Sequence, residues 1–337
     1  MNCAGKSTPA VTRSCIPPDL STCENLAMHH TPPGLRASLL RALCYLTLLI
    51  ATSPVGAADF GPGFKTQAVA VDGGTVSVTV GGSGPPVVLI HGYAESSRMW
   101  KPLVKVLAPS FTVIAPDLPG FGDSSIPQAG LDMKTSAERV RAAVKSLGYS
   151  KVRLVGHDIG LMVAYAYAAM YPQEVEKLAL MDAFLPGVGG WEAVYNNPGI
   201  WHFRFHGPTP EALVKGRERI YFEHFWNDFA ADKTHSIPEV DRRAYALEYA
   251  RPGRMAAGFA HFAAFLRTAA DFAELSKTRL SIPVLSIGGA KANGLALGAQ
   301  AKLIASDVTV IVLKDTGHWI LEERPGETIS ALVGFLK

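Results

Sequence analysis

The alternation of short, continuous apolar runs with longer amphipathic stretches constrains the fold most strongly. Six apolar runs stand out: Val87–Ile90, Phe111–Ala115, Val152–Val155, Lys177–Met181, Pro283–Ile287 and Val308–Leu313. Apolar runs of this length are typical of strands that are covered on both faces. Strands that alternate with helices through short loops indicate an α/β fold, with a mostly parallel sheet and helices on both sides.

Local sequence signals predict the limits of two helices and one hairpin. The spacing of apolar residues predicts a helix over Thr135–Leu147, and Gly148 is a typical residue to end it. A second helix is predicted over Leu161–Met170. Gln67–Val71 and Val76–Val80 flank an Asp-Gly-Gly sequence, which predicts a hairpin.

The alternation stops between Phe184 and about Ser281. That segment is rich in aromatic residues and histidine and has no clear strand, whereas helical stretches such as Glu211–Phe225 dominate it. The segment is roughly 95 residues long, far more than a single crossover needs. We therefore expect a helical cap over residues 184–280, inserted into a core made of residues 58–183 and 281–337. Ordinary crossover helices are the alternative.

Residues 1–57 have the order of features found in an export leader. Two arginines precede the apolar run Ala42–Ala51, and small residues follow it. The run is shorter than the roughly 20 residues of a transmembrane helix, although a buried core helix is an alternative reading. We expect cleavage after Ala57 or Ala58, a natural start at Met28, and an exported protein that is periplasmic or secreted.

Composition excludes several kinds of site and partner. All four cysteines lie before the expected cleavage point, so the mature chain would have no disulfide and no thiolate nucleophile. The histidines lack a metal-binding spacing such as HExxH, and no nucleotide-binding fingerprint is present. We expect neither metal nor cofactor. Lysine and arginine total 32 against 29 acidic residues, without a basic run, which argues against a nucleic-acid partner.

The pentapeptide Gly156-His157-Asp158-Ile159-Gly160 connects a predicted strand to a predicted helix. It has the small-x-nucleophile-x-small pattern of a nucleophile elbow, with Asp158 where many enzymes have serine. Such a turn projects the central side chain at the carboxyl end of the sheet. The helix N-terminus beneath it favours negative charge. The alternative is that Asp158 only caps the helix.

Three further motifs follow predicted strands in the order that such a site requires. His91-Gly92-Tyr93 follows the first buried strand, and the backbone N–H groups of Tyr93 and Ile159 would form an oxyanion hole. The sequence DLPGFGDS, residues 117–124, reads as a tight glycine-rich loop. His318 follows the last strand, where a base would face the elbow.

On these motifs, the chain from about Gly63 onward resembles the α/β-hydrolase fold, in the epoxide hydrolase and haloalkane dehalogenase group. The leader and three cap stretches are similar to exported Cif-type epoxide hydrolases; the stretches are Trp201–Phe203, Gly216–Phe225 and Glu274–Leu280. The resemblance implies a mostly parallel eight-stranded sheet with helices on both faces and an inserted helical cap.

The resemblance also implies a role for Asp182. Many relatives carry the acid of the triad after the penultimate strand, but here that loop, Ile287–Gly294, has no carboxylate. Cif-type enzymes place the acid one strand after the nucleophile, where this chain has Asp182. Asp182 would then orient His318 and stabilise its charge. A simple loop or cap residue is the alternative.

The resemblance further implies that a cap histidine and a cap tyrosine hold the leaving oxygen. His202 matches the histidine, but Phe262 stands where the tyrosine is expected and cannot donate a hydrogen bond. His261, Tyr245 and Tyr249 are candidate substitutes. Trp201 is a further candidate substrate contact.

Together these residues predict a hydrolase that opens epoxides to vicinal diols. The carboxylate of Asp158 would attack a saturated carbon and form an ester, and His318 would activate the water that cleaves it. The substrate is expected to be a small apolar molecule, with water as co-substrate, and the chain is compatible with a homodimer. A haloalkane or haloacid dehalogenase is one alternative, although Ile159 stands where such enzymes carry tryptophan or arginine. Trp201 and His202 would then hold the halide. A non-catalytic ligand-binding homologue is another alternative.

Overall fold

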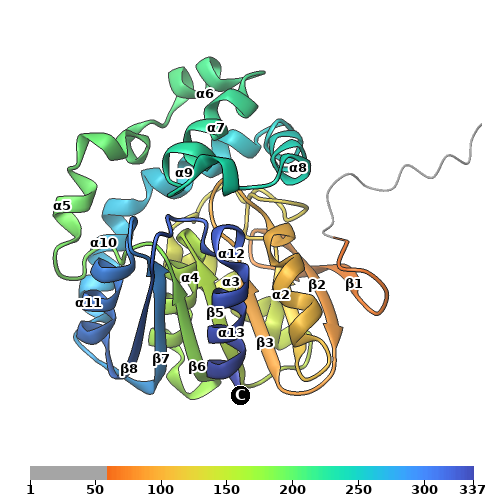
Figure 1. Cartoon of the computed structure of the whole chain (residues 1–337). Coiled ribbons are helices and arrows are strands. Elements are labelled where there is room, and N and C mark those ends of the chain that lie inside the picture. Colours follow the sequence, from red (N-terminus) through yellow and green to blue (C-terminus); the bar gives the residue numbers. More distant parts are fainter. Residues whose placement is uncertain (1–58) are drawn as a thin grey trace, which may run out of the picture. The chain divides into compact units, whose positions relative to one another are not determined.

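The computed structural model describes residues 59–337, so the expected leader over residues 1–57 lies outside the described residues. The described chain contains an eight-stranded sheet in the order β1-β2-β4-β3-β5-β6-β7-β8 (Figure 1). Its strands are β1 (Lys65–Val71), β2 (Gly74–Gly82), β3 (Pro86–Ile90), β4 (Thr112–Pro116), β5 (Val152–His157), β6 (Val175–Met181), β7 (Leu280–Gly289) and β8 (Ala305–Leu313). β2 pairs antiparallel with β1 and β4, and all other neighbours are parallel. The predicted hairpin and the mostly parallel sheet are confirmed.

Apolar layers cover both faces of the central strands, which explains why β3 is apolar throughout. In β3, Val87 and Leu89 belong to one buried cluster, whereas Val88 and Ile90 belong to the other. Side chains alternate between the two faces of a strand, so a strand covered on both faces needs apolar residues at every position. The helices of the core are α2 (Lys101–Leu107), α3 (Met133–Ser146), α4 (Ile159–Met170), α11 (Gly294–Ile304), α12 (Ile320–Glu323) and α13 (Pro325–Leu336), with short 3-10 helices η1 (Ser97–Trp100) and η2 (Pro172–Glu174).

Helix α3 begins two residues before the predicted start because Asp132 caps it. The Asp132 Oδ1 atom accepts the Thr135 N–H at 2.9 Å. The helix ends at Ser146, one residue before the predicted Leu147. Gly148 follows as the expected stop residue, with φ +90° and its N–H donated to the Lys145 carbonyl at 2.9 Å. Helix α4 begins at Ile159, so β5 and α4 are separated by Asp158 alone.

The segment between β6 and β7 is helical and contains no strand. Figure 1 shows its helices gathered above the sheet; they are α5 (Trp191–Tyr195), η3 (Pro198–Arg204), α6 (Pro208–Val214), α7 (Glu218–Asp228), η4 (Lys233–His235), α8 (Glu239–Tyr249), α9 (Arg254–Ala263) and α10 (Phe265–Leu275). The expected continuous helix over Glu211–Phe225 is wrong. Lys215 leaves the helical conformation with ψ 120°, and Gly216 follows with φ +75°, which separates α6 from α7. Within residues 59–337, no helix has the length and apolar character of a membrane span.

Candidate active site

Asp158 occupies a strained turn between β5 and α4. Its backbone has φ +53° and ψ −128°, a conformation that costs energy in any residue other than glycine and that occurs at nucleophile elbows. Neighbouring glycines make the turn fit sterically. A Cβ atom on Gly156 would lie 2.3 Å from the Gly160 carbonyl oxygen, and one on Gly160 would lie 2.3 Å from the Ile90 carbonyl oxygen. The turn thereby holds the Asp158 side chain in one place.

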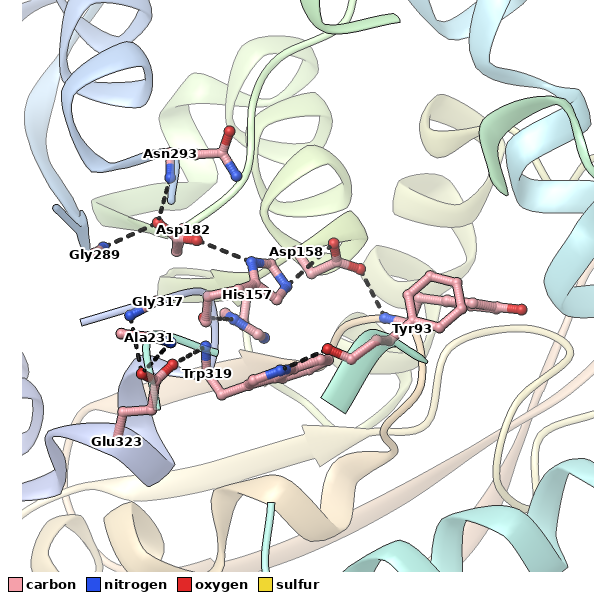
Figure 2. Close-up of polar contacts among 12 residues, drawn as sticks. Tyr93, His157, Asp158, Asp182, Ala231, Gly289, Asn293, Gly317, Trp319 and Glu323 are labelled. Atoms are coloured by element: carbon pink, nitrogen blue, oxygen red, sulfur yellow. Dashed lines mark hydrogen bonds and ion pairs between the residues drawn. The ribbon is translucent and has the colours of Figure 1, made fainter. Parts of the chain in front are cut away.

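The two carboxylate oxygens of Asp158 have different surroundings. Oδ1 accepts a hydrogen bond from the Tyr93 N–H at 2.8 Å, whereas Oδ2 lies 3.6 Å from His318 Nε2 (Figure 2). Gly92 allows the Tyr93 amide to approach, since a Cβ there would lie 2.6 Å from Asp158 Cβ. Ile159 is the first residue of α4, so its N–H has no acceptor within the helix. The described residues show no hydrogen bond from Ile159 to the carboxylate.

Asp182 orients His318. Asp182 is fully buried, and its Oδ2 lies 2.9 Å from His318 Nδ1. Its Oδ1 accepts the N–H groups of Gly289 at 3.0 Å and Asn293 at 3.1 Å. A carboxylate with these partners is an acceptor only, so Nδ1 of His318 carries the proton. His318 Nε2 therefore faces Asp158 Oδ2 and is the ring nitrogen left to exchange a proton with a water molecule.

Glu323 holds the loop that carries His318. Its carboxylate accepts the backbone N–H groups of Gly317 at 3.0 Å, Trp319 at 3.1 Å and Ala231 at 2.9 Å (Figure 2). The His318 N–H in turn donates to the Phe229 carbonyl at 2.8 Å. The base is thus tied to the cap segment that follows α7. Nothing in the sequence analysis singles out Glu323, because an acidic residue in the first turn of a helix is common.

The other motif residues support the site without entering it. Asp117 accepts the N–H groups of Ser97 and Asp123, each at 3.1 Å, and so fixes the glycine-rich loop. His91 accepts the Leu118 N–H at Nε2 and donates from Nδ1 to the Gly92 carbonyl. Burial lowers the pKa of His91, which agrees with a neutral ring that has one donor and one acceptor.

A cavity of about 370 Å³ opens beside Asp158. Its apolar lining is Met162, Ala183, Phe184, Val194, Ile200, Phe203, Phe229, Ala230, Phe262, Phe265 and Ala292, and its polar lining is Asp158, Asn197, His202, Asp228, Lys291, Asn293 and His318. A small recess next to it is lined by Asp158, His202, Phe262 and His318 together with four further aromatic residues. A small, largely apolar molecule would therefore rest against Asp158.

His202 is the cap histidine beside the nucleophile. Its side chain is buried among Phe203, Phe225 and Phe262, with ring centroids 4.5 to 5.3 Å away. Burial, with smaller effects from His224 and His318, lowers the pKa of His202 to about 3. The ring is therefore neutral over the working pH range and offers one N–H donor.

Phe262 lines the cavity, but the expected substitute donors do not. His261 lies beside it on α9 and points elsewhere, since its Nε2 donates to the Pro119 carbonyl at 3.0 Å and its ring stacks on Phe121. Tyr249 donates its hydroxyl to the Glu95 carbonyl at 3.2 Å. Neither side chain lines the cavity, so neither acts as a substrate contact in this geometry.

Tyr245 and Trp201 also lie outside the cavity. Tyr245 is buried, with its ring centroid 6.4 Å from that of Trp226. Trp201 is 37% exposed and packs against His224 at 5.1 Å on the outer side of the cap. The expected role of Trp201 as a substrate contact is not met. Among residues 59–337, no three His, Cys, Asp or Glu side chains are grouped to hold a metal ion.

Comparison with known proteins agrees with this geometry. The profile of the alpha/beta hydrolase fold family matches residues 85–325. The soluble epoxide hydrolase of Corynebacterium sp. (strain C12) is 32% identical over 272 residues, which cover 79% of this chain and 94% of that protein. A fluoroacetate dehalogenase of Burkholderia sp. is 32% identical over 171 residues, 48% of this chain and 56% of that protein.

One solved structure shows the same fold over almost the whole chain. The Cif epoxide hydrolase from Acinetobacter nosocomialis has a TM-score of 0.77 at 24% identity, over 93% of this chain and 99% of that one. With the family profile and the Corynebacterium relative, these similarities establish that the chain belongs to the alpha/beta hydrolase fold family, in its epoxide hydrolase group.

Proposed function

We propose that this protein hydrolyses epoxides to vicinal diols through an ester of Asp158. The observation that carries the proposal is the unequal environment of the two Asp158 oxygens. Oδ1 is held by a backbone amide, whereas Oδ2 has no such partner and borders the cavity beside His318. One oxygen is thus placed to receive charge and the other to attack.

In the first step, Oδ2 attacks a carbon of the epoxide. The new C–O bond forms as the ring C–O bond breaks, and the electron pair moves to the ring oxygen. A carboxylate needs no general base for this displacement. The neutral His202 donates a hydrogen bond to the departing oxygen, which water then protonates.

In the second step, water cleaves the ester. His318 Nε2 takes a proton from the water, whose oxygen attacks Asp158 Cγ. Oδ1 becomes the oxyanion and is stabilised by the Tyr93 N–H, which already lies 2.8 Å away. Asp182 stabilises the His318 imidazolium until the proton passes to the departing alcohol, which carries Oδ2 away.

A dehalogenase would use the same three residues, and the fluoroacetate dehalogenase relative favours this as the second candidate. The structure has fewer side chains suited to bind a halide or a haloacid than to bind an epoxide. The Ile159 side chain is apolar and fully buried, and the described lining of the 370 Å³ cavity includes neither tryptophan nor arginine.

We also propose that the protein is exported. Support comes from the leader-like order of residues 1–57 and from the position of all four cysteines within it. A chain without cysteine after cleavage folds in an oxidising compartment without forming incorrect disulfides.

Export predicts a defined mature N-terminus. When the full chain is expressed in a Gram-negative host, mass spectrometry of periplasmic protein should find a chain that begins at Ala58 or Asp59. Leu48→Arg, which interrupts the apolar run, should keep the protein in the cytoplasm. Periplasmic protein that still begins at Met1 or Met28 would contradict the proposal.

Replacing the base predicts a trapped ester. His318→Gln should accumulate an adduct of full substrate mass with 1,2-epoxyhexane, seen by intact-protein mass spectrometry, because ester formation does not need the base. The adduct should be lost in Asp158→Asn/His318→Gln. An adduct with 1-bromohexane or fluoroacetate but not with the epoxide would favour the dehalogenase. No adduct with any of them would favour a binding protein.

Removing the charge of Asp182 predicts slow ester cleavage. Asp182→Asn should slow single-turnover cleavage at least about 100-fold, because His318 loses the partner that fixes its tautomer. Ester formation should change far less. Asp315→Asn removes an exposed carboxylate near the same loop and should match wild type. Equal rates for wild type and Asp182→Asn would remove Asp182 from the mechanism.

Adding a hydroxyl at position 262 predicts faster ring opening. Phe262→Tyr should accelerate ester formation about 10-fold, the effect of one added hydrogen bond to the leaving oxygen. Phe203→Tyr is the matched control, because Phe203 lines the main cavity but not the recess beside Asp158. Rapid-quench mass spectrometry measures both rates. An unchanged rate in Phe262→Tyr would show that His202 alone suffices.

A further inference from the structure

We propose that Glu323 is a positioning residue that keeps His318 in place when a large substrate presses on the cap, so that ester cleavage proceeds at similar rates for small and large epoxides. The inference rests on the proposed function, because it concerns the second step of that reaction. Glu323 itself lines neither the main cavity nor the recess beside Asp158. Its effect on the reaction would therefore pass through the residues that it binds.

The base loop, Gly317–Trp319, meets the cap segment Phe229–Ala231 along a short junction. The two chains approach each other closely. A Cβ atom on Gly317 would lie 2.4 Å from the Ala231 nitrogen and 2.5 Å from the Phe229 carbonyl oxygen. Gly317 does not have a positive φ, so this position needs glycine because of the contact and not because of the backbone conformation. A shift of one chain must therefore displace the other.

Glu323 binds both sides of this junction with one carboxylate (Figure 2). Its Oε2 atom accepts the N–H of Gly317 at 3.0 Å and that of Ala231 at 2.9 Å, and its Oε1 atom accepts the N–H of Trp319 at 3.1 Å. The carboxylate is anchored in the core, because Glu323 is the last residue of α12, where Ile320 is fully buried. The cap segment is thus bonded to the core as well as to the base loop.

The cap side of the junction is also a wall of the substrate site. Phe229 and Ala230 line the main cavity, and Phe229 also lines the recess beside Asp158. A substrate large enough to press on Phe229 therefore pushes on the backbone whose carbonyl accepts the His318 N–H at 2.8 Å. Because protein interiors are closely packed, such a push is passed on to the neighbouring chain.

Without the Glu323 carboxylate, His318 would follow the cap segment. The Phe229 carbonyl would still hold the His318 N–H, but the Ala231 N–H would lose its acceptor in the core. Misplacing a catalytic group by about 1 Å can slow a reaction on the order of 100-fold. Ester cleavage uses His318 and would slow, more so for a larger substrate. Ester formation does not use His318 and would stay nearly unchanged.

The test compares 1,2-epoxybutane with 1,2-epoxydecane, which share the same reacting carbons and differ in length. Rapid-quench mass spectrometry of single turnovers gives the rates of ester formation and cleavage. Glu323→Gln keeps the shape of the side chain but has one acceptor oxygen, and its NH₂ group would face an N–H donor. We expect it to slow cleavage at least about 10-fold more for the longer epoxide than for the shorter one.

Two further variants separate the junction from the carboxylate. Gly317→Ala pushes the two chains apart while Glu323 remains, and it should show the same dependence on substrate length. Glu327→Gln is the matched control, because Glu327 is an exposed glutamate in the first turn of α13, and it should match wild type.

Equal slowing of cleavage for both epoxides would mean that Glu323 supports only the fold, and this result would overturn the inference, as would unchanged cleavage. Should the variants fail to fold, amide hydrogen exchange of the wild-type protein by NMR decides. Slow exchange of the Ala231 amide supports the inference, because Glu323 is its acceptor, and exchange at the rate of an unprotected amide overturns it. If wild type forms no ester with either epoxide, the proposed function fails instead, and the exchange result still stands.

Discussion

The positive φ of Asp158 is the constraint on which the active site depends. It lets the chain turn from β5 directly into α4, so that one carboxylate leaves the sheet between the Tyr93 amide and the His318 ring. The strain is tolerable because glycines at 156 and 160 remove the side chains that would collide with the turn. A nucleophile fixed in this way loses little entropy when it attacks.

Few polar groups surround that carboxylate. The Asp182 carboxylate accepts hydrogen bonds from His318 and from the loop after β7. Glu323 connects the His318 loop to the cap through hydrogen bonds. The cap supplies aromatic walls and the neutral donor His202 beside Asp158. The site therefore provides little hydrogen bonding to the leaving oxygen. In contrast, it stabilises negative charge on Asp158 well.

The sequence predicts the sheet well because apolar runs identify strands covered on both faces, and the motif order places Asp158, Tyr93 and His318 at their ends. It cannot predict the rotation of a cap helix. His261 and Phe262 are adjacent on α9 and point about 100° apart, so only one can face the cavity. The glycine at position 216 is a local signal for the break between α6 and α7, since its φ is +75°. The partners of Glu323, in contrast, depend on tertiary contacts, which no local pattern encodes.

The central claim is that one oxygen of the diol comes from Asp158 rather than from water. A single turnover with excess enzyme in H₂¹⁸O measures this directly. We expect unlabelled diol and one ¹⁸O atom in the peptide that carries Asp158, because water attacks Cγ and Oδ2 leaves with the product. Labelled diol together with an unlabelled Asp158 peptide would mean that water opens the epoxide directly, and it would contradict the account.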